Sequence, residues 1–341
     1  MPRKTATIRL PLLLITPLLS SCSIFEFYSQ GIAGQVEILR KSRSCEMVIA
    51  DLATPEALRK RLQLTKELRQ FASHELALPG HSAYGKYADL GRNHVIFVLF
   101  AAPEFSMEPK TWRYPLIGEM DYRGYFNEED AAAYAKKLIA DGYETYLGGT
   151  DAYSTLGFFH DPVLNTFAGY SEIDFAELIF HELTHIRIFR KGETTFNESL
   201  AKAVAEEGVR KWLISKGRRT ELADYEERLI RRREFYHEID TTRRELTDIY
   251  ASVRPAEEMR KSKQIALDRL KTRARALQAR WGGKLLEGWL RLDLTNAHLL
   301  PLVTYNNKIE NFRKLLEESD SDFETFFRKL EEIESPLHPK L

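Results

Sequence analysis

Residues 181–185, with the sequence HELTH, constrain the fold more than any other segment of the chain. Side chains four residues apart share one face of an α-helix, so a helix would bring both imidazoles to one metal ion. Glu182 lies one step around that helix, where its carboxylate can reach a water held by the metal. Zinc suits this arrangement, because it polarises carbonyls and lowers the pKa of bound water to about 7. We therefore predict that His181 and His185 bind zinc and that Glu182 is the general base.

The flanking sequence predicts that this helix is buried. Ser171 and Asp174 have the spacing of a capping box, which marks a helix start. Apolar residues follow at helical spacing, and Gly192 is a natural C-cap where the helix is expected to end. Two histidines on such an apolar helix need polar partners, and a shared metal supplies one. The alternative is a helix whose histidines have ordinary solvated or packed roles.

Glu198 is the candidate third ligand. A second helix is expected to begin near Thr195, and a short connection would return Glu198 toward His185. A carboxylate there completes the two-histidine, one-glutamate set of catalytic zinc sites and leaves the fourth position for water. In the competing interpretation Thr195 and Glu198 form a capping box, and Glu198 binds only backbone N–H groups.

The N-terminus has the features of a bacterial lipoprotein signal. Arg3, Lys4 and Arg9 precede an apolar run at residues 10–19, which is too short for a permanent membrane helix. Small residues then precede Cys22, and this resembles a lipobox, in which the cysteine is lipidated and becomes the new N-terminus. We expect residues 1–21 to be a signal peptide; the alternatives are a cleaved signal without an anchor or a buried helix.

The residue after the cysteine and the remaining cysteine refine this prediction. Ser23 rather than Asp follows Cys22, and by resemblance this favours the outer membrane, with the protein facing the periplasm. The chain has 2 cysteines. If Cys22 is acylated, Cys45 has no partner for an intrachain disulfide, and we expect it to be a small packing residue.

The pattern of apolar residues predicts an α+β fold that is mostly α. Residues 95–100 are β-branched or aromatic and predict a buried strand. We expect a small sheet packed beside the HELTH helix, and a single domain over residues 22–341. The other strands are expected at residues 111–118, 122–126 and 143–147, and helices at 24–44, 55–74, 127–141, 306–317 and 320–332.

Residues 218–280 form a highly charged stretch with apolar residues at heptad spacing, interrupted by Pro255. We predict two long helices folded back as a hairpin arm. A solvated helical pair is the simpler interpretation, and a surface that binds a protein partner is the alternative. The formal net charge is +0, with 50 basic and 50 acidic residues. We therefore expect no nucleic-acid partner, since such a partner is marked by a basic excess.

Several motifs resemble a bacterial family of predicted aminopeptidases, which are metallopeptidase-like lipoproteins. Residues 197–201, with the sequence NESLA, also look like the Asn-Glu-x-x-Ala motif that supplies the third zinc ligand in the gluzincins. The resemblance implies a Zn²⁺ aminopeptidase acting on peptides. The other matching segments are GIAGQ at 31–35, YADLGR at 87–92, AAPEF at 101–105, YRGYF at 122–126, TLG at 155–157 and DPVL at 161–164.

The same resemblance suggests two further roles. Tyr305 is a candidate donor to the oxyanion of the tetrahedral intermediate, because gluzincins often use a tyrosine or histidine there; a core tyrosine is the alternative. An aminopeptidase also needs an acid for the substrate's ammonium group, and Glu104, Glu119 and Glu172 are candidates. The rival functions are a zinc endopeptidase and a non-catalytic envelope lipoprotein with a structural metal site and a partner-binding arm.

Overall fold

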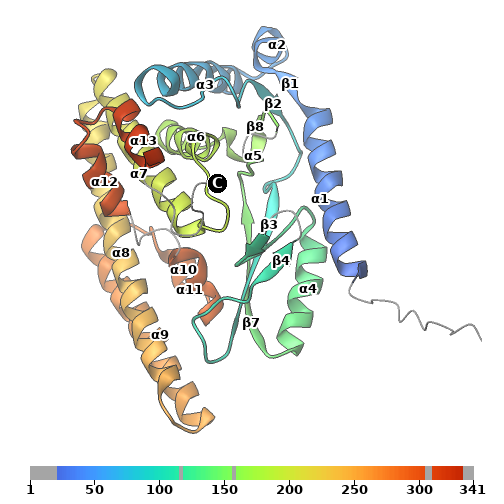
Figure 1. The fold of residues 1–341 in the computed structure, drawn as a ribbon, viewed down its shortest axis with the longest axis vertical. Coiled ribbons are helices and arrows are strands. Elements are labelled where there is room, and N and C mark those ends of the chain that lie inside the picture. The colour runs from blue at the N-terminus through green and yellow to red at the C-terminus, as the bar shows by residue number, and fades with distance from the viewer. Residues whose placement is uncertain (1–20, 115–117, 156–158, 304–308, 333–341) are drawn as a thin grey trace, which may run out of the picture.

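The computed structural model describes residues 21–114, 118–155, 159–303 and 309–332 (Figure 1). Helices dominate the described chain and short strands form small sheets, so the predicted α+β, mostly α, class is confirmed. The helices in the first half are α1 (Ser21–Lys41), α2 (Cys45–Ala50), α3 (Glu56–Glu75), α4 (Glu128–Ala140) and α5 (Asn165–Ala168). Those in the second half are α6 (Glu172–Arg187), α7 (Thr194–Ser215), α8 (Arg219–Ala251), α9 (Ala256–Trp281), α10 (Glu287–Leu290), α11 (Asn296–Val303), α12 (Ile309–Glu317) and α13 (Phe323–Glu332).

The sheet nearest the site has the strand order β6-β3-β7 and is antiparallel. Its strands are β3 (Ile96–Pro103), β6 (Arg123–Tyr125) and β7 (Tyr143–Thr150). Successive side chains of a strand point to opposite faces, so Leu99 and Ala101 pack with α4 while Phe100 points to the other face. Asn127 is the N-cap of helix α4, and its side chain accepts a hydrogen bond from Asp130 N at 3.1 Å.

Two smaller sheets were not predicted as such. The strands β1 (Arg43–Ser44), β2 (Lys86–Ala88) and β8 (Val163–Leu164) form a mixed sheet, and they are too short to show a period in the sequence. The single strand expected at 111–118 is wrong, because β4 (Trp112–Tyr114) and β5 (Gly118–Met120) pair antiparallel.

The side chain of Gln30 ties helix α1 to the edge of the β6-β3-β7 sheet. The amide of Gln30 donates to Gly124 O at 3.3 Å and accepts from Phe126 N at 2.8 Å, much as a neighbouring strand would. None of the helices among the described residues is long and apolar enough to span a bilayer.

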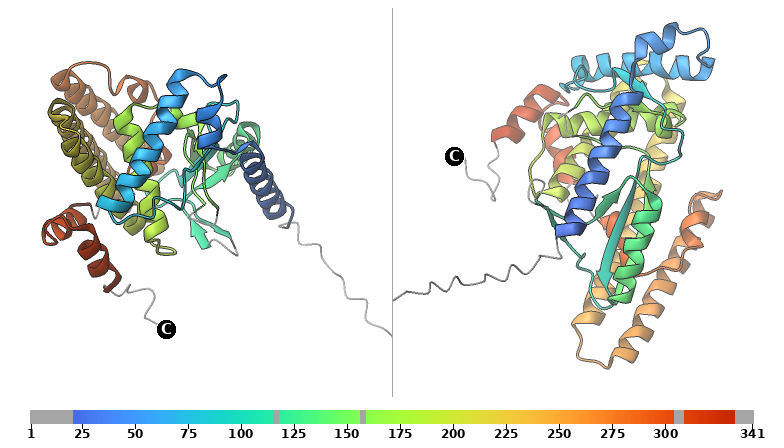
Figure 2. Two further views of the ribbon diagram at one scale, coloured as in Figure 1. Left: turned by 90° about the horizontal axis from the view of Figure 1, so that it is seen from above. Right: turned by 90° about the vertical axis from the view of Figure 1, so that its right-hand side faces the viewer.

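The predicted hairpin arm is confirmed as α8 and α9, which pack together and turn at Pro255, the N-cap of α9 (Figure 2). The arm lies across the molecule from α1. Phe235, Ile239 and Leu270 belong to an apolar cluster shared by the arm and neighbouring elements. The arm is therefore more than a solvated pair of helices. Its ion pairs with the body of the protein include those of Arg260 with Glu104 at 2.6 Å and of Lys263 with Glu144.

Candidate metal centre

Helix α6, which carries the HELTH motif, forms for the reasons visible in its sequence. Ser171 caps it, accepting from Asp174 N at 3.1 Å and donating to the Asp174 carboxylate at 2.6 Å. The side chains of Phe175, Ile179 and Leu183 are fully buried in the main core. The helix start at Ser171 and the buried apolar face are thus confirmed.

The end of α6 differs from the prediction. The helix ends at Arg187 rather than Gly192, and Ile188 is already extended. Asn197 explains this, because its side chain accepts from Arg190 N at 2.8 Å and donates to Arg190 O at 2.7 Å. The N–H and C=O of Arg190 thus bond to a side chain instead of to the backbone groups of a continuing helix. Gly192 instead takes φ +79° within the connecting loop.

The three predicted ligands converge where α6 packs against α7. His181 Nε2 lies 3.2 Å from His185 Nε2 and 3.4 Å from a Glu198 carboxylate oxygen, and the other oxygen lies 3.6 Å from His185 Nε2. Zinc ligands at 2.0–2.1 Å in a tetrahedron are separated by about 3.3 Å. The spacing and donor types of the group therefore fit a metal ion such as zinc.

The capping interpretation of Glu198 is wrong. Helix α7 begins at Thr194 with Glu193 as its N-cap, and no side chain makes the cap hydrogen bond there. The Glu198 carboxylate points instead toward the two imidazoles, and its pKa is lowered: burial opposes ionisation, but the hydrogen bond and charge of His181 outweigh it.

The two imidazoles differ in charge state when no metal is bound. Burial lowers the pKa of His181, but the Glu198 carboxylate more than compensates, so the net pKa is raised. Burial, together with the positive charge of His181, lowers the pKa of His185 to about 4. His185 is thus neutral, the form that binds metals. Its Nδ1 is buried and has no hydrogen-bond partner in the described part of the chain, whereas metal-binding histidines usually have one.

The surroundings of Glu182 include Asp161 and Ser154, two residues that the sequence did not link to it. Burial raises its pKa to about 7, opposed by His181 and reinforced by Glu198 and Asp161. The Ser154 hydroxyl hydrogen-bonds to the carboxyls of Glu182 and Asp161. A carboxyl that titrates near neutral pH is suited to both accepting and donating a proton.

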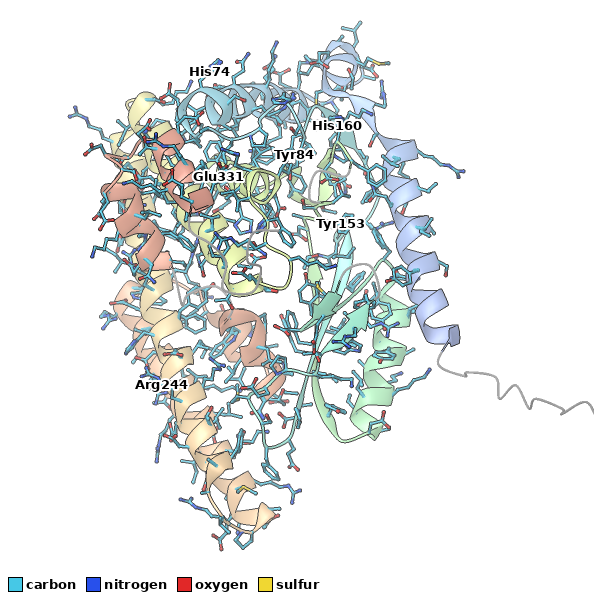
Figure 3. The ribbon with its side chains drawn as sticks, viewed as in Figure 1. His74, Tyr84, Tyr153, His160, Arg244 and Glu331 are labelled. Atoms are coloured by element: carbon cyan, nitrogen blue, oxygen red, sulfur yellow. The ribbon has the colours of Figure 1, made fainter. Side chains whose placement is uncertain are left out.

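Asp161 organises the loop that holds Ser154 against Glu182. Its buried carboxylate accepts from Thr155 N and Thr155 Oγ1, both at 2.8 Å, and its carbonyl accepts from Tyr84 N at 2.7 Å. Tyr84 has φ +60°, an uncommon backbone conformation for a residue other than glycine. In Figure 3, Tyr84, Tyr153 and His160 lie in the region between α6 and α1.

Tyr122 reaches the site from the sheet. Its ring packs on Phe100, on the sheet face that also carries Tyr146 and lies away from α4. Burial raises the pKa of Tyr122 to about 12, and the charges of Glu198, Glu182 and Asp121 add to this effect. The β5–β6 turn therefore brings Tyr122 within electrostatic reach of Glu198 and Glu182, a placement that its segment at 122–126 did not predict.

The candidate acids for the substrate's ammonium group, and the candidate oxyanion donor Tyr305, differ in their surroundings. Glu104 is paired with Arg260, and Glu172 is paired with Arg218 at 2.8 Å. Glu119 lies exposed on β5. Burial raises the pKa of the neighbouring Asp121, and the charges of Glu119 and Glu108 add to this effect. Tyr305 lies outside the described residues.

The two cysteines also have different surroundings. Cys22 falls in the first turn of α1. Cys45 is buried and free, and burial raises the pKa of its thiol to about 11, as expected for a packing residue.

The fold and the site define a mostly α-helical protein in which the HELTH helix α6 and the following helix α7, which carries Glu198, form a candidate metal centre. The family model described as "Putative aminopeptidase" matches residues 26–339. The chain therefore belongs to this family, and a peptide substrate fits it. No curated protein and no solved structure matches the chain.

Proposed function

We propose that this protein is a zinc-dependent aminopeptidase that uses His181, His185 and Glu198 as ligands. The observation that carries the proposal is the group of three ligand atoms, all within 4.8 Å of one another and beside a carboxyl that titrates near neutral pH. The family match supports peptide hydrolysis independently.

Zinc bound by these residues would polarise the scissile carbonyl and acidify water. Glu182 takes a proton from the attacking water and later passes it to the leaving amine. The Ser154 hydroxyl orients the Glu182 carboxyl, while burial and the charges of Glu198 and Asp161 keep the pKa of Glu182 high. Tyr305 and Tyr122 are the tyrosines we propose as donors to the developing oxyanion.

The preference for a free N-terminus needs an acid that binds ammonium. Glu104 and Glu172 already pair with arginines, so we propose Glu119 and Asp121 for this role. Asp121 has no ion-pair partner in the described ranges, and it directly precedes Tyr122, which faces the site.

The test compares the wild type with Glu182→Gln and Glu198→Ala. Gln is nearly isosteric with Glu, so Glu182→Gln should retain one zinc per chain but lose about 10²–10⁴-fold in peptide hydrolysis, the usual contribution of general acid–base catalysis. Glu198→Ala should lose most of the zinc. Zinc content is measured by elemental analysis, and hydrolysis is measured on peptides with free and blocked N-termini.

Three outcomes separate the rivals. Cleavage of only the free peptides supports an aminopeptidase, and equal cleavage of both indicates an endopeptidase. If no peptide in a broad library is cleaved in a zinc-dependent and Glu182-dependent way, the protein is better explained as an envelope lipoprotein with a structural metal site.

A further inference from the structure

A cavity of about 330 Å³ lies between α7, α8 and α12, close to the candidate metal centre. Lys202 lines this cavity. It lies four residues after Glu198 and therefore on the same face of α7. One helical turn, about 5.4 Å along the axis, separates the two residues. A substrate residue next to the scissile bond can extend its side chain over that distance.

The lining of the cavity is rich in cations. Lys202, Arg232, Arg233 and Arg313 contribute positive charge, and the Lys202 ammonium lies 4.5 Å from the centre of the Tyr236 ring. Leu229, Ile239, Leu302 and Ile309 supply apolar walls.

The acids in the lining already have arginine partners. Glu206 pairs with Arg313 and, at 3.7 Å, with Arg232. Glu310 pairs with Arg313 at 2.5 Å, and Asp240 pairs with Arg244 at 3.0 Å. In contrast, no acid in the described part of the chain lies within ion-pair distance of Arg233, which is exposed at the cavity. The cavity thus offers a guanidinium group to an anion from outside.

We propose that this cavity binds a carboxylate of the peptide substrate, close to the bond that is cleaved, and that Arg233 is the residue that selects it. The planar fork of a guanidinium matches a carboxylate, and the apolar walls suit the methylene groups of an acidic side chain. This proposal rests on the proposed peptidase function. The carboxylate comes from an acidic first residue, an acidic second residue or the C-terminus of a dipeptide.

Three matched peptide pairs distinguish these sources. They are Glu-Ala-Ala-amide against Gln-Ala-Ala-amide, Ala-Glu-Ala-amide against Ala-Gln-Ala-amide, and Ala-Ala against Ala-Ala-amide. For the pair whose carboxylate stands at the position that the cavity recognises, the wild type should cleave the carboxylate peptide with a kcat/KM about tenfold higher than the neutral peptide. Hydrogen bonds to charged groups contribute roughly that factor or more.

Arg233→Gln should remove this preference and leave hydrolysis of the neutral peptide unchanged. Arg275→Gln is the control, because Arg275 is an exposed arginine on α9 that does not line the cavity; it should behave as the wild type. Cleavage of all pairs without preference, or a preference that survives Arg233→Gln, would overturn the carboxylate site and leave the peptidase standing. Absence of any peptide cleavage would overturn both.

Discussion

At the scale of single residues, the site separates its carboxyl groups by their surroundings. Glu198 faces two imidazoles and its pKa is lowered, so it remains an anion over a wide pH range. Glu182, one position from His181, is buried beside Glu198 and Asp161, and its pKa is raised. When the surroundings of two carboxyl groups push their pKa values apart, the two groups can play different chemical roles. Here Glu198 is suited to ligation and Glu182 to proton transfer.

The raised pKa of Glu182 makes a prediction for the metal-free protein. Its pKa is about 7 in the folded state against 4.5 for the free side chain. Its contribution to stability is therefore fully present below pH 4.5 and is lost as the pH rises through 7. Glu182→Gln has no such titration, so from pH 5 to pH 8 the metal-free wild type should lose stability relative to the variant. Thermal unfolding midpoints of both proteins in a chelator, measured across this range, test the idea. A difference that does not change with pH would contradict it.

At the scale of elements, the connection between α6 and α7 decides whether the ligands meet. The Asn197 side chain is buried and bonds both backbone groups of Arg190, fixing the loop just before Glu198. These bonds also end α6 early. The connection therefore depends on a contact between residues seven apart, and not on the glycine at position 192.

Replacing Asn197 with Ala should weaken metal binding, although Asn197 is not a ligand. The change removes the acceptor of the partly buried Arg190 N–H, and loss of such a partner costs about 1–3 kcal/mol. The Arg190 carbonyl keeps its bond from Glu193 N at 3.1 Å, but the loop that orients Glu198 loses both bonds to the Asn197 side chain. Ser171→Ala is the matched control, because loss of a helix cap costs about 1 kcal/mol but leaves this loop intact. We expect both variants to unfold at lower temperature and only Asn197→Ala to bind zinc more weakly, measured by competition with a chromogenic chelator. Equal zinc affinity in the two variants would show that Asn197 does not position Glu198.

The same elements show what the sequence could predict. Capping residues and apolar spacing are local signals, and they located α4, α6 and both helices of the arm. The HELTH motif and Glu198 predicted a group that the fold brings together. Tyr122 and Asp161 stood only in matching segments and Ser154 in none, and no role was assigned to the three, because they reach the site from loops and a strand turn. Their proximity depends on tertiary packing, which has no periodic pattern in the chain.

At the scale of the whole molecule, the arm and the sheet form one body around α11. The Asn296 side chain donates to the carbonyls of Pro103, Glu104 and Ser106 at 3.0–3.1 Å, and its Oδ1 accepts from the Tyr250 hydroxyl at 2.8 Å. These bonds tie β3 to α8. The outward face of the arm still offers a surface for a protein partner, which remains a prediction.

The anchoring of the molecule is the last prediction. We propose that the mature chain begins at Cys22, carries lipid there, and is held at the periplasmic face of the outer membrane. Cys22 lies in the first turn of α1, so the lipid would hold the protein by the end of that helix and leave the arm on the far side (Figure 1). Cys22→Ala should give an unprocessed precursor or a protein released from membranes, because the acylated residue is gone.

Cys45→Ala is the matched control for this change, since Cys45 is buried and lies after α1. It should leave processing and membrane association as in the wild type. Intact mass of the purified membrane-bound protein identifies both the start of the chain and any acyl group. A membrane-bound wild type that begins before Cys22, or that starts there without acyl mass, would refute the anchor. Peptide hydrolysis by the released Cys22→Ala protein should equal that of the wild type, because the ligands and Glu182 lie on α6 and α7 rather than on the anchored helix.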